Sequence, residues 1–393
     1  MRIAMLGHKR IPSREGGVEI VVEQLAVRMA AMGHQVTVYN RKGHHVSTGV
    51  ERKTGADKKK HSYRGVTVCP VFTFEKKSLN AIVYAFLATL RAVAGKFDVI
   101  HFHAEGPCAM LWLPHLLGIP TVATIHGLDW QRAKWGGFAT RFLLFGEKMA
   151  AKFADQVIVL SENVQHYFQD TYGRDTVYIP NGIDRPVKKG ADLIQKQYGL
   201  TENSYLLFLS RLVPEKGAHY LVDAYRELKK EGALQGKKLV IAGGSSHSGE
   251  YVQELKRKVG EDPDILMTGF VEGTALEELY SNAWIYVQPS DVEGMPLSLL
   301  EAMSYGNCCV VSDIPENGNV VGEHGLTFQK GQIQDLKQVL LKLSGEPETV
   351  QELKNGAADY ICEKFRWQQV VEQTLELYRK AVTAHRKKKH RQA

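Results

Sequence analysis

The sequence predicts an α/β protein of two doubly wound domains, each a parallel sheet covered by helices on both faces. Three observations carry this prediction. The chain has 393 residues, too many for one ordinary α/β domain and suitable for two of about 150 residues each. Short β-branched runs alternate with helical patterns along the whole chain. These runs are continuously apolar rather than alternating, which is typical of strands buried on both faces.

The expected elements follow from this alternation. In the first half, strands are expected at 3–6, 35–39, 66–71, 99–102, 121–125, 157–160 and 177–179, and helices at 18–32, 79–94, 140–154 and 162–171. In the second half, strands are expected at 205–209, 238–242, 265–267, 285–288 and 309–312, and helices at 218–230, 250–259, 275–281 and 297–304. A long amphipathic helix is expected at 367–382.

The boundary between the two domains is expected between Pro180 and Pro186. Proline, asparagine and glycine gather in this segment and interrupt both periodicities. We therefore predict an N-terminal domain over 1–182 and a C-terminal domain over 183–365, followed by a final helix at about 366–385 and a basic tail over 386–393.

The composition excludes several classes of protein. Five cysteines, with no C-x-x-C spacing, argue against a disulfide framework or a zinc cluster and fit a reducing cytosol. No apolar run is long enough to span a membrane, and the first one, 3–6, is too short for a signal peptide. The protein is therefore expected in the cytoplasm.

The formal net charge is +7, and part of the excess lies in the tail from His385 to Arg391. A polybasic run of this kind can be solvated, or it can contact an anionic membrane surface weakly. No nucleic-acid-binding motif accompanies it, so nucleic acid is not an expected partner. Solvation and weak contact with the inner face of a membrane both stay open.

The most informative segment, Asp291 to Met303, follows the expected strand 285–288. Pro296 suits the start of a helix, and Gly294 lets a ligand approach the backbone. Free amides at a helix start attract an anion such as a diphosphate. Glu293 and Glu301, about two turns apart, suit the hydroxyls of a sugar and a ribose. The plain alternative is a capped helix with two solvated glutamates.

Two more segments place polar or glycine residues at expected strand ends. Arg211 and Lys216 follow the strand 205–209, and two cations suit a diphosphate leaving group, although alone they are also ordinary surface residues. Gly16 and Gly17 precede the first helix and permit close backbone approach. A Gly-x-Gly-x-x-Gly fingerprint is missing there, which weakens a dehydrogenase interpretation.

His126 follows the strand 121–125, where a histidine can handle a proton, although most single histidines are structural. His101, His103 and Glu105 could converge from one strand face as metal ligands. The strand is expected to end near Phe102, which favours a polar wall instead. No Asp-x-Asp motif is present, so no metal is predicted, and the two cations at Arg211 and Lys216 can replace one electrostatically.

Together these motifs resemble the retaining glycosyltransferases of family 4, which have the GT-B fold of two Rossmann-like domains facing across a cleft. The resemblance rests on five features in the family's order. These are Gly16-Gly17, His126-Gly127, the segment Pro180 to Asp184, Arg211 with Lys216, and Glu293-x7-Glu301. It covers nearly the whole chain. The opening from Gly7 to Glu19 is also similar to a bacterial cell-surface polysaccharide subgroup that includes proteins described as rhamnosyltransferases.

The resemblance implies a role for each matching residue. Arg211 and Lys216 would neutralise the departing diphosphate, Glu293 would hold donor-sugar hydroxyls, and Glu301 would bind the ribose. The remaining donor-side residues are Gly17, Gly243, Gly244, Gly269, Phe270, Val271, Gly294, Met295, Pro296 and Leu297. His126 would lie beside the transferring sugar, with Gly16 and Asp129 on the acceptor side. The final helix would cross back onto the N-terminal domain.

The expected reaction transfers a sugar from a nucleoside diphosphate to a hydroxyl with retention, without a cofactor. Uridine is the favoured base, before guanosine or thymidine. The acceptor is expected to be a lipid-linked or growing glycan. A nucleotide-sugar epimerase of the same fold and a non-catalytic partner subunit stay open as alternatives. A glycoside hydrolase is disfavoured, because it would leave the phosphate features unused.

Overall fold

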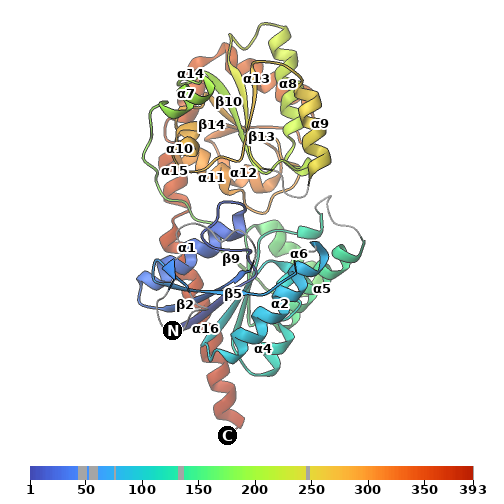
Figure 1. The fold of residues 1–393 in the computed structure, drawn as a ribbon, viewed down its shortest axis with the longest axis vertical. Coiled ribbons are helices and arrows are strands. Elements are labelled where there is room, and N and C mark those ends of the chain that lie inside the picture. The colour runs from blue at the N-terminus through green and yellow to red at the C-terminus, as the bar shows by residue number, and fades with distance from the viewer. Residues whose placement is uncertain (43–50, 53–60, 75–76, 132–136, 245–247, 393) are drawn as a thin grey trace. The chain divides into compact units, whose positions relative to one another are not determined.

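The chain is described by a computed structural model over residues 1–42, 51–52, 61–74, 77–131, 137–244 and 248–392. It divides into two compact units (Figure 1). The first, called the N-terminal unit here, contains Met1–Asn181 and Trp367–Ala393. The second, the C-terminal unit, contains Gly182–Arg366. The chain thus leaves its first unit, builds the second, and returns to the first through its last helix.

The N-terminal unit is built on a nine-stranded sheet of order β3-β4-β5-β2-β1-β6-β7-β8-β9. Its strands are β1 Arg2–Leu6, β2 Gln35–Arg41, β3 Glu51–Arg52, β4 His61–Tyr63, β5 Val66–Val71, β6 Val99–His103, β7 Thr121–Ile125, β8 Gln156–Val159 and β9 Val177–Tyr178. All pairs are parallel except those made by β3 and β4 at one edge. The predicted parallel sheet is therefore confirmed.

Helices cover both faces of this sheet. They are α1 Gly17–Ala31, α2 Lys77–Ala94, α3 Glu105–Cys108, α4 Trp112–Leu116, α5 Gly137–Phe153, α6 Glu162–Tyr172 and α16 Trp367–Gln392. Side chains of α2, α3, α5 and α6 share one buried cluster with Ile100 and Phe102 of β6. On the other face, α16 contacts α1, β6 and β7, and the Tyr378 hydroxyl lies 2.6 Å from His101 Nδ1. Since neighbouring strand residues point to opposite faces, His101 and Phe102 separate the two layers.

The C-terminal unit has a six-stranded, fully parallel sheet of order β12-β11-β10-β13-β14-β15. Its strands are β10 Tyr205–Leu209, β11 Lys238–Ala242, β12 Ile265–Gly269, β13 Ile285–Gln288, β14 Cys308–Ser312 and β15 Gly325–Phe328. Its helices are α7 Leu193–Tyr198, α8 Ala218–Lys230, α9 Gly249–Val259, α10 Gly273–Asn282, α11 Leu297–Ser304, α12 Pro315–Val321, α13 Ile333–Gly345, α14 Pro347–Lys354 and α15 Ala357–Lys364. The second predicted doubly wound domain is thus confirmed.

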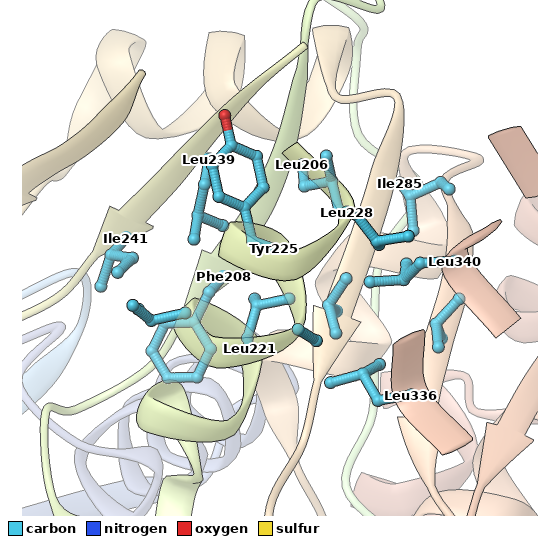
Figure 2. Close-up of a cluster of buried hydrophobic side chains, with 14 of the residues drawn as sticks. Leu206, Phe208, Leu221, Tyr225, Leu228, Leu239, Ile241, Ile285, Leu336 and Leu340 are labelled. Carbon is cyan, nitrogen blue, oxygen red and sulfur yellow. The ribbon is translucent and has the colours of Figure 1, made fainter. Parts of the chain in front are cut away.

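The core of the C-terminal unit lies between its sheet and helices α8 and α13. Leu221, Tyr225 and Leu228 of α8 are spaced three and four residues apart and face the strands (Figure 2). The hydroxyl of Tyr225 reaches the rim of this core and donates to the Lys237 carbonyl at 2.8 Å. Helix α8 therefore buries its apolar side chains against the sheet, and the one polar group among them, the Tyr225 hydroxyl, still has a hydrogen-bond partner.

The structure adds elements that the periodicity did not predict. They are strands β3, β4 and β15 and helices α3, α4, α7, α12, α13, α14 and α15. The missed strands are short and lie at or next to a sheet edge. Several of the missed helices span only one or two turns, too few for a period to be visible. The predicted tail over 386–393 is wrong in one respect, because α16 continues to Gln392. Lysine and arginine are good helix formers and extend it.

No helix within the described ranges combines the length and the apolar character that crossing a bilayer requires.

Candidate active site

The predicted donor residues of the C-terminal unit gather at one edge of its sheet. Strands β10, β11 and β13 are neighbours and parallel, so the loops that follow them leave from the same edge. The residues that follow the strands are 210–217, 243–244 and 289–296. Arg211 and Lys216 lie on the first loop, Gly243 and Gly244 on the second, and Glu293 on the third. The carboxyl end of a parallel sheet is where open α/β folds bind ligands.

An ion pair joins the first and third loops. Lys216 Nζ lies 2.5 Å from Glu293 Oε2, and the two side chains are only 12% and 7% exposed. Lys216 ends a 3₁₀ turn, Pro214–Lys216, and Glu293 lies in the loop before α11. Removing the Lys216 ammonium group from a nearly buried pair of this kind is costly, because it leaves the Glu293 charge buried without its partner. The structure therefore brings together two residues that the sequence assigns to one site.

Two glycines allow these loops to approach so closely. A Cβ on Gly243 would lie 1.8 Å from the Ser210 carbonyl oxygen, and φ at Gly243 is +153°. A Cβ on Gly217 would lie 2.0 Å from the Pro289 carbonyl oxygen, and φ there is +70°. No other residue fits either position without moving the backbone. The glycines thus set the spacing of all three loops.

The loop before α11 is packed rather than open. Gly294, Met295, Pro296 and Leu297 are buried. Pro296 is the N-cap residue, and the helix itself runs from Leu297 to Ser304, as the sequence predicted. The proline still serves the predicted purpose, since its ring restricts the backbone where the chain enters the helix.

A network of buried side chains supports this loop from below. Gln288, the last residue of β13, accepts hydrogen bonds from Tyr286 at 3.0 Å and from Ser298 at 3.1 Å. Its amide donates to Asn317 Oδ1 at 2.9 Å. Asn317 in turn donates to Ser312 Oγ at 3.0 Å, and Ser312 donates to the Ser290 carbonyl at 2.5 Å. These bonds tie both ends of the loop to the sheet, so the position of Glu293 is fixed through groups that are mostly buried.

Glu301 lies on the second turn of α11, as predicted. Its Oε2 lies 3.2 Å from the Tyr280 hydroxyl, which donates to it. The Tyr280 ring stacks on Tyr305 with centroids 5.4 Å apart. Tyrosine therefore orients a carboxylate that the sequence places near a ribose.

The segment assigned to the base lies beside the second loop. Strand β12 ends at Gly269, whose carbonyl accepts from the Gly243 amide at 2.8 Å. A Cβ on Gly244 would lie 3.5 Å from the Phe270 side chain. The Phe270 ring is 50% exposed, and Val271 follows it. Gly243, Gly244, Gly269 and Phe270 thus lie together at the sheet edge.

In the N-terminal unit, the predicted residues lie at the start of α1 and after β7. Gly16 is the N-cap of α1 and Gly17 its first residue. The buried Glu19 carboxylate accepts from the Lys9 amide at 2.9 Å and fixes the loop that precedes these glycines. His126 follows β7, and Asp129 begins a 3₁₀ turn, Asp129–Gln131.

His126 has a partner that the sequence did not predict. Its Nε2 lies 3.1 Å from His103 Nδ1 at the end of the neighbouring strand β6. His103 itself is fully buried, and its ring centroid lies 4.0 Å from that of His101, with the two rings tilted by 36°. Burial, reinforced by the other histidines, holds the pKa of His103 well below its usual range. His103 is therefore neutral, and it can fix the ring orientation of His126.

The predicted strand end at Phe102 is wrong, since β6 includes His103. The chain then turns at Ala104, which has φ of +71°, and Glu105 begins α3. The neighbouring charges that help to raise the pKa of the buried Glu105 are those of Asp129 and Glu147. Within the described residues, no three His, Cys, Asp or Glu side chains are grouped as a metal site.

Glu105 and Glu147 form a buried pair of carboxyl groups. Both are 0% exposed, and Glu147 accepts a hydrogen bond from Tyr167 at 2.8 Å and one from Tyr172 at 2.5 Å. Burial, with the negative charges of Asp129 and Glu147, raises the pKa of Glu105 to about 11. Glu105 therefore keeps its proton at neutral pH, because two charges cannot share this volume.

Replacing Glu105 by glutamine is expected to make the protein relatively more stable as pH rises. The folded wild type retains a proton that the unfolded chain releases above its ordinary carboxyl pKa of 4.5. The contribution of Glu105 to the free energy of unfolding is therefore complete below pH 4.5. Above that pH it falls by up to about 1.4 kcal/mol per pH unit. Glutamine removes this dependence. The measurement is the difference in Tm between variant and wild type at about pH 5.5 and about pH 8. An unchanged difference would show that Glu105 is ionised in the folded state.

Sequence reasoning missed several residues that shape the two sites. Gln288 was detectable as a polar residue in an apolar strand. His103 was expected only as part of a polar wall, and its contact with His126 was detectable from their positions at adjacent strand ends. Glu215 gave no signal, although its carboxylate is 7% exposed and lacks a hydrogen-bond partner among the described residues. Its backbone carbonyl accepts from the Asp291 amide at 2.9 Å and links the first and third loops.

Two family models of known proteins match this chain, and the regions that they match correspond to its two units. A family model described as Glycosyltransferase Family 4 matches residues 15–185, and one described as Glycosyl transferases group 1 matches residues 191–360. A D-inositol 3-phosphate glycosyltransferase from Thermomonospora curvata is 25% identical, with 92% of this chain and 90% of the relative covered. An Escherichia coli UDP-Gal:alpha-D-GlcNAc-diphosphoundecaprenol alpha-1,3-galactosyltransferase is 29% identical, with 57% and 59% covered.

Solved structures show the same fold. Anabaena HepE in complex with UDP-glucose superposes with a TM-score of 0.75 at 19% identity, covering 96% of this chain and 98% of that one. The two matched models lie one on each side of the unit boundary, in the order that the motifs predict. The chain therefore belongs to the family 4 glycosyltransferases of the GT-B fold, with its group 1 domain in the C-terminal unit.

Proposed function

We propose that this glycosyltransferase moves a sugar from a nucleoside diphosphate, with UDP favoured, to a hydroxyl of a lipid-linked or growing glycan, with retention of configuration. The observation that carries the donor assignment is the Lys216–Glu293 pair at 2.5 Å. It places a cation and a carboxylate side by side at the sheet edge where such folds bind ligands. A diphosphate needs the first group and sugar hydroxyls suit the second.

Breaking the bond between the anomeric carbon and the phosphate is the barrier of this reaction. Negative charge grows on the diphosphate and positive charge on the sugar. Lys216 and Arg211 neutralise the leaving group in our proposal, and preorganised charge of this kind is a large term in catalysis. The neighbouring network through Gln288 holds the loop of Glu293 before substrate arrives, so little reorganisation is needed.

The remaining donor contacts follow from the same edge of the sheet. Glu301, oriented by Tyr280, accepts hydrogen bonds from the ribose. The segment Gly269 to Val271 lies beside Gly243 and Gly244 and suits the base. Anabaena HepE, which shares the fold, has been solved with UDP-glucose, and this supports uridine over other bases.

Retention is proposed to occur by attack on the same face that the diphosphate leaves. The leaving phosphate oxygen then takes the acceptor proton, so no side chain needs to become a covalent nucleophile. No metal is required in this scheme, since Lys216 and Arg211 carry the positive charge.

Acceptor recognition is assigned to Gly16, Gly17, His126 and Asp129 of the N-terminal unit. The galactosyltransferase relative acts on a diphosphoundecaprenol-linked sugar, which supports a lipid-linked acceptor and work at the inner membrane surface.

The test is a thermal-shift screen against nucleoside diphosphates and their sugars, followed by NMR of the product. Stabilisation by UDP and one UDP-sugar, together with a product that keeps the donor's anomeric configuration in the presence of a chelator, would support the proposal in full. Stabilisation by another nucleotide alone would reassign the base. A product with inverted configuration would overturn the mechanism, and the absence of any nucleotide binding would overturn the donor site.

A further inference from the structure

One face of the N-terminal unit carries large apolar side chains in water. Helices α2, α4 and α5 each turn such residues outward. We call this surface the α2–α4–α5 face and define it by Phe86, Leu90, Trp112, Leu116, Phe138 and Phe145, which are between 37% and 72% exposed. Single exposed apolar residues are ordinary, but a group of this size on one face of a protein marks a contact surface.

These residues lie on one side of the molecule because their helices do. Tyr84 and Ala88 of α2, Leu111 next to α4 and Ala150 of α5 all pack into the same cluster against one face of the sheet. Helix α4 contacts both α2 and α5, and Figure 1 shows the three helices along that side of the N-terminal unit. Their outer sides therefore point away from the sheet together.

The exposed charges on α2, α4 and α5 all have one sign, whereas α6, which packs into the same cluster, carries exposed Glu162 and Asp170. Arg91, Arg141, Lys148 and Lys152 are exposed on α2 and α5. The three helices contain a single carboxylate, Glu147, and it is 0% exposed. Exposed acidic side chains are therefore missing from α2, α4 and α5, although α8 and α9 of the other unit carry both signs.

We infer that the α2–α4–α5 face binds the surface of an anionic lipid bilayer. Aromatic and leucine side chains enter the boundary between headgroups and acyl chains, and arginine and lysine beside them attract anionic headgroups. A protein partner would be expected to find some acidic groups for its own cations, and α2, α4 and α5 expose none. Apolar residues and basic residues without any exposed carboxylate match a lipid surface best.

This inference rests on the proposed function, because a lipid-linked acceptor has to be met at a membrane. It also differs from the expectation for the basic tail, since the contact is made by the body of the N-terminal unit. Nothing in the face belongs to either predicted site. Membrane binding and sugar transfer can therefore be measured independently of each other.

The experiment is co-sedimentation of the full chain with vesicles of phosphatidylcholine alone and of phosphatidylcholine with about 30% phosphatidylglycerol. The wild type is expected to bind the mixed vesicles and to dissociate at high salt. The pair Arg141→Glu and Lys148→Glu is expected to weaken partitioning by at least about tenfold, since each basic residue near the surface contributes about fivefold. The pair Leu116→Ser and Phe138→Ser is expected to weaken it as well.

The matched control is a variant of the C-terminal unit with the same change in net charge. Lys256→Glu with Arg257→Glu, on the exposed side of α9, is expected to leave partitioning within about twofold. All variants should keep the Tm of the wild type and its donor hydrolysis without vesicles. Loss of hydrolysis in the wild type would count against the proposed function and leave the vesicle result unaffected.

Three results would overturn the inference. The first is equal binding of the wild type to neutral and anionic vesicles together with no effect of the apolar variants. The second is an equal loss in the α9 control, which would reduce the effect to net charge. The third is binding that survives the face variants but disappears when residues 387–393 are deleted, which would move the contact to the end of α16.

Discussion

Replacing Lys216 by alanine is expected to lower the turnover of the enzyme about 100-fold or more, the size of loss seen when a charge-stabilising donor is removed from an active site. Lys216 lies 2.5 Å from Glu293 and is 12% exposed, so water cannot readily substitute for its charge. If the ammonium group stabilises the departing diphosphate, the loss should appear in kcat as well as in kcat/KM. The measurement is steady-state transfer or donor hydrolysis with a UDP-sugar.

The same substitution should also destabilise the C-terminal unit. It leaves the Glu293 carboxylate, 7% exposed, without its partner, at a cost of about 3 kcal/mol. A structural effect of this size could imitate a catalytic one. The variants Lys216→Ala, Glu293→Ala and the double variant separate the two. The double variant removes both charges and should recover part of the lost stability, while its turnover should stay as low as that of either single variant.

Lys258→Ala provides the matched control in the same unit. Lys258 pairs with Asp223 at 2.6 Å, but both side chains are about one third exposed. Exposed pairs contribute at most about 1 kcal/mol, so this variant should keep its turnover and nearly all of its stability. If the double variant at Lys216 and Glu293 regained normal turnover, the pair would be structural only, and the donor-site assignment would fail.

Replacing Gly243 by alanine is expected to destabilise the C-terminal unit by about 3 kcal/mol or more and to abolish nucleotide binding. The new Cβ would lie 1.8 Å from the Ser210 carbonyl oxygen, which is backbone and cannot rotate away. One of the two loops has to move. Because the Gly243 amide also donates to Gly269, the displacement should reach the segment assigned to the base. Chemical denaturation and UDP titration measure the two effects.

Gly232→Ala isolates the contact from the backbone conformation. Gly232 has φ of +70°, and a Cβ there would meet nothing within 4 Å. Alanine at this position would only have to adopt a left-handed backbone conformation, which should lower stability by about 1 kcal/mol. The affinity for UDP should stay unchanged. Equal losses of stability in the two variants would mean that the approach of Gly243 to Ser210 is easily relaxed, and the close packing of these loops would then have no part in binding.

The sequence by itself determined the two sheets and the helices that cover them. Runs of mainly apolar and β-branched residues such as Tyr205–Leu209 and Thr121–Ile125 match the observed strands at both ends, because a strand buried on both faces is built largely of such residues. Ala218–Lys230 is equally clear, since its apolar stripe repeats with the helical period. Each of these signals is local, and each extends over enough residues to be recognised.

The candidate site was predictable only as a set of strand ends. Arg211, Gly243 and Glu293 follow neighbouring parallel strands, and this topology alone brings their loops to one edge. That Lys216 pairs with Glu293 depends on the path of both loops, which Gly217 and Gly243 permit through close backbone contacts. Contacts between residues far apart in the chain leave no periodic pattern in it.

Only the tertiary structure decided which polar residues are buried and with what neighbours. Glu105 and Glu147 are 42 positions apart (147 minus 105). The sequence predicted Glu105 only as part of a polar wall and Glu147 only as one residue of a helix. Packing α3 against α5 places them together, with a Cβ on Gly146 only 2.0 Å from the Glu105 carbonyl oxygen. The resulting rise in the pKa of Glu105 comes from lost solvation and nearby charge. Both are properties of the assembled core, and neither exists in the chain before it folds.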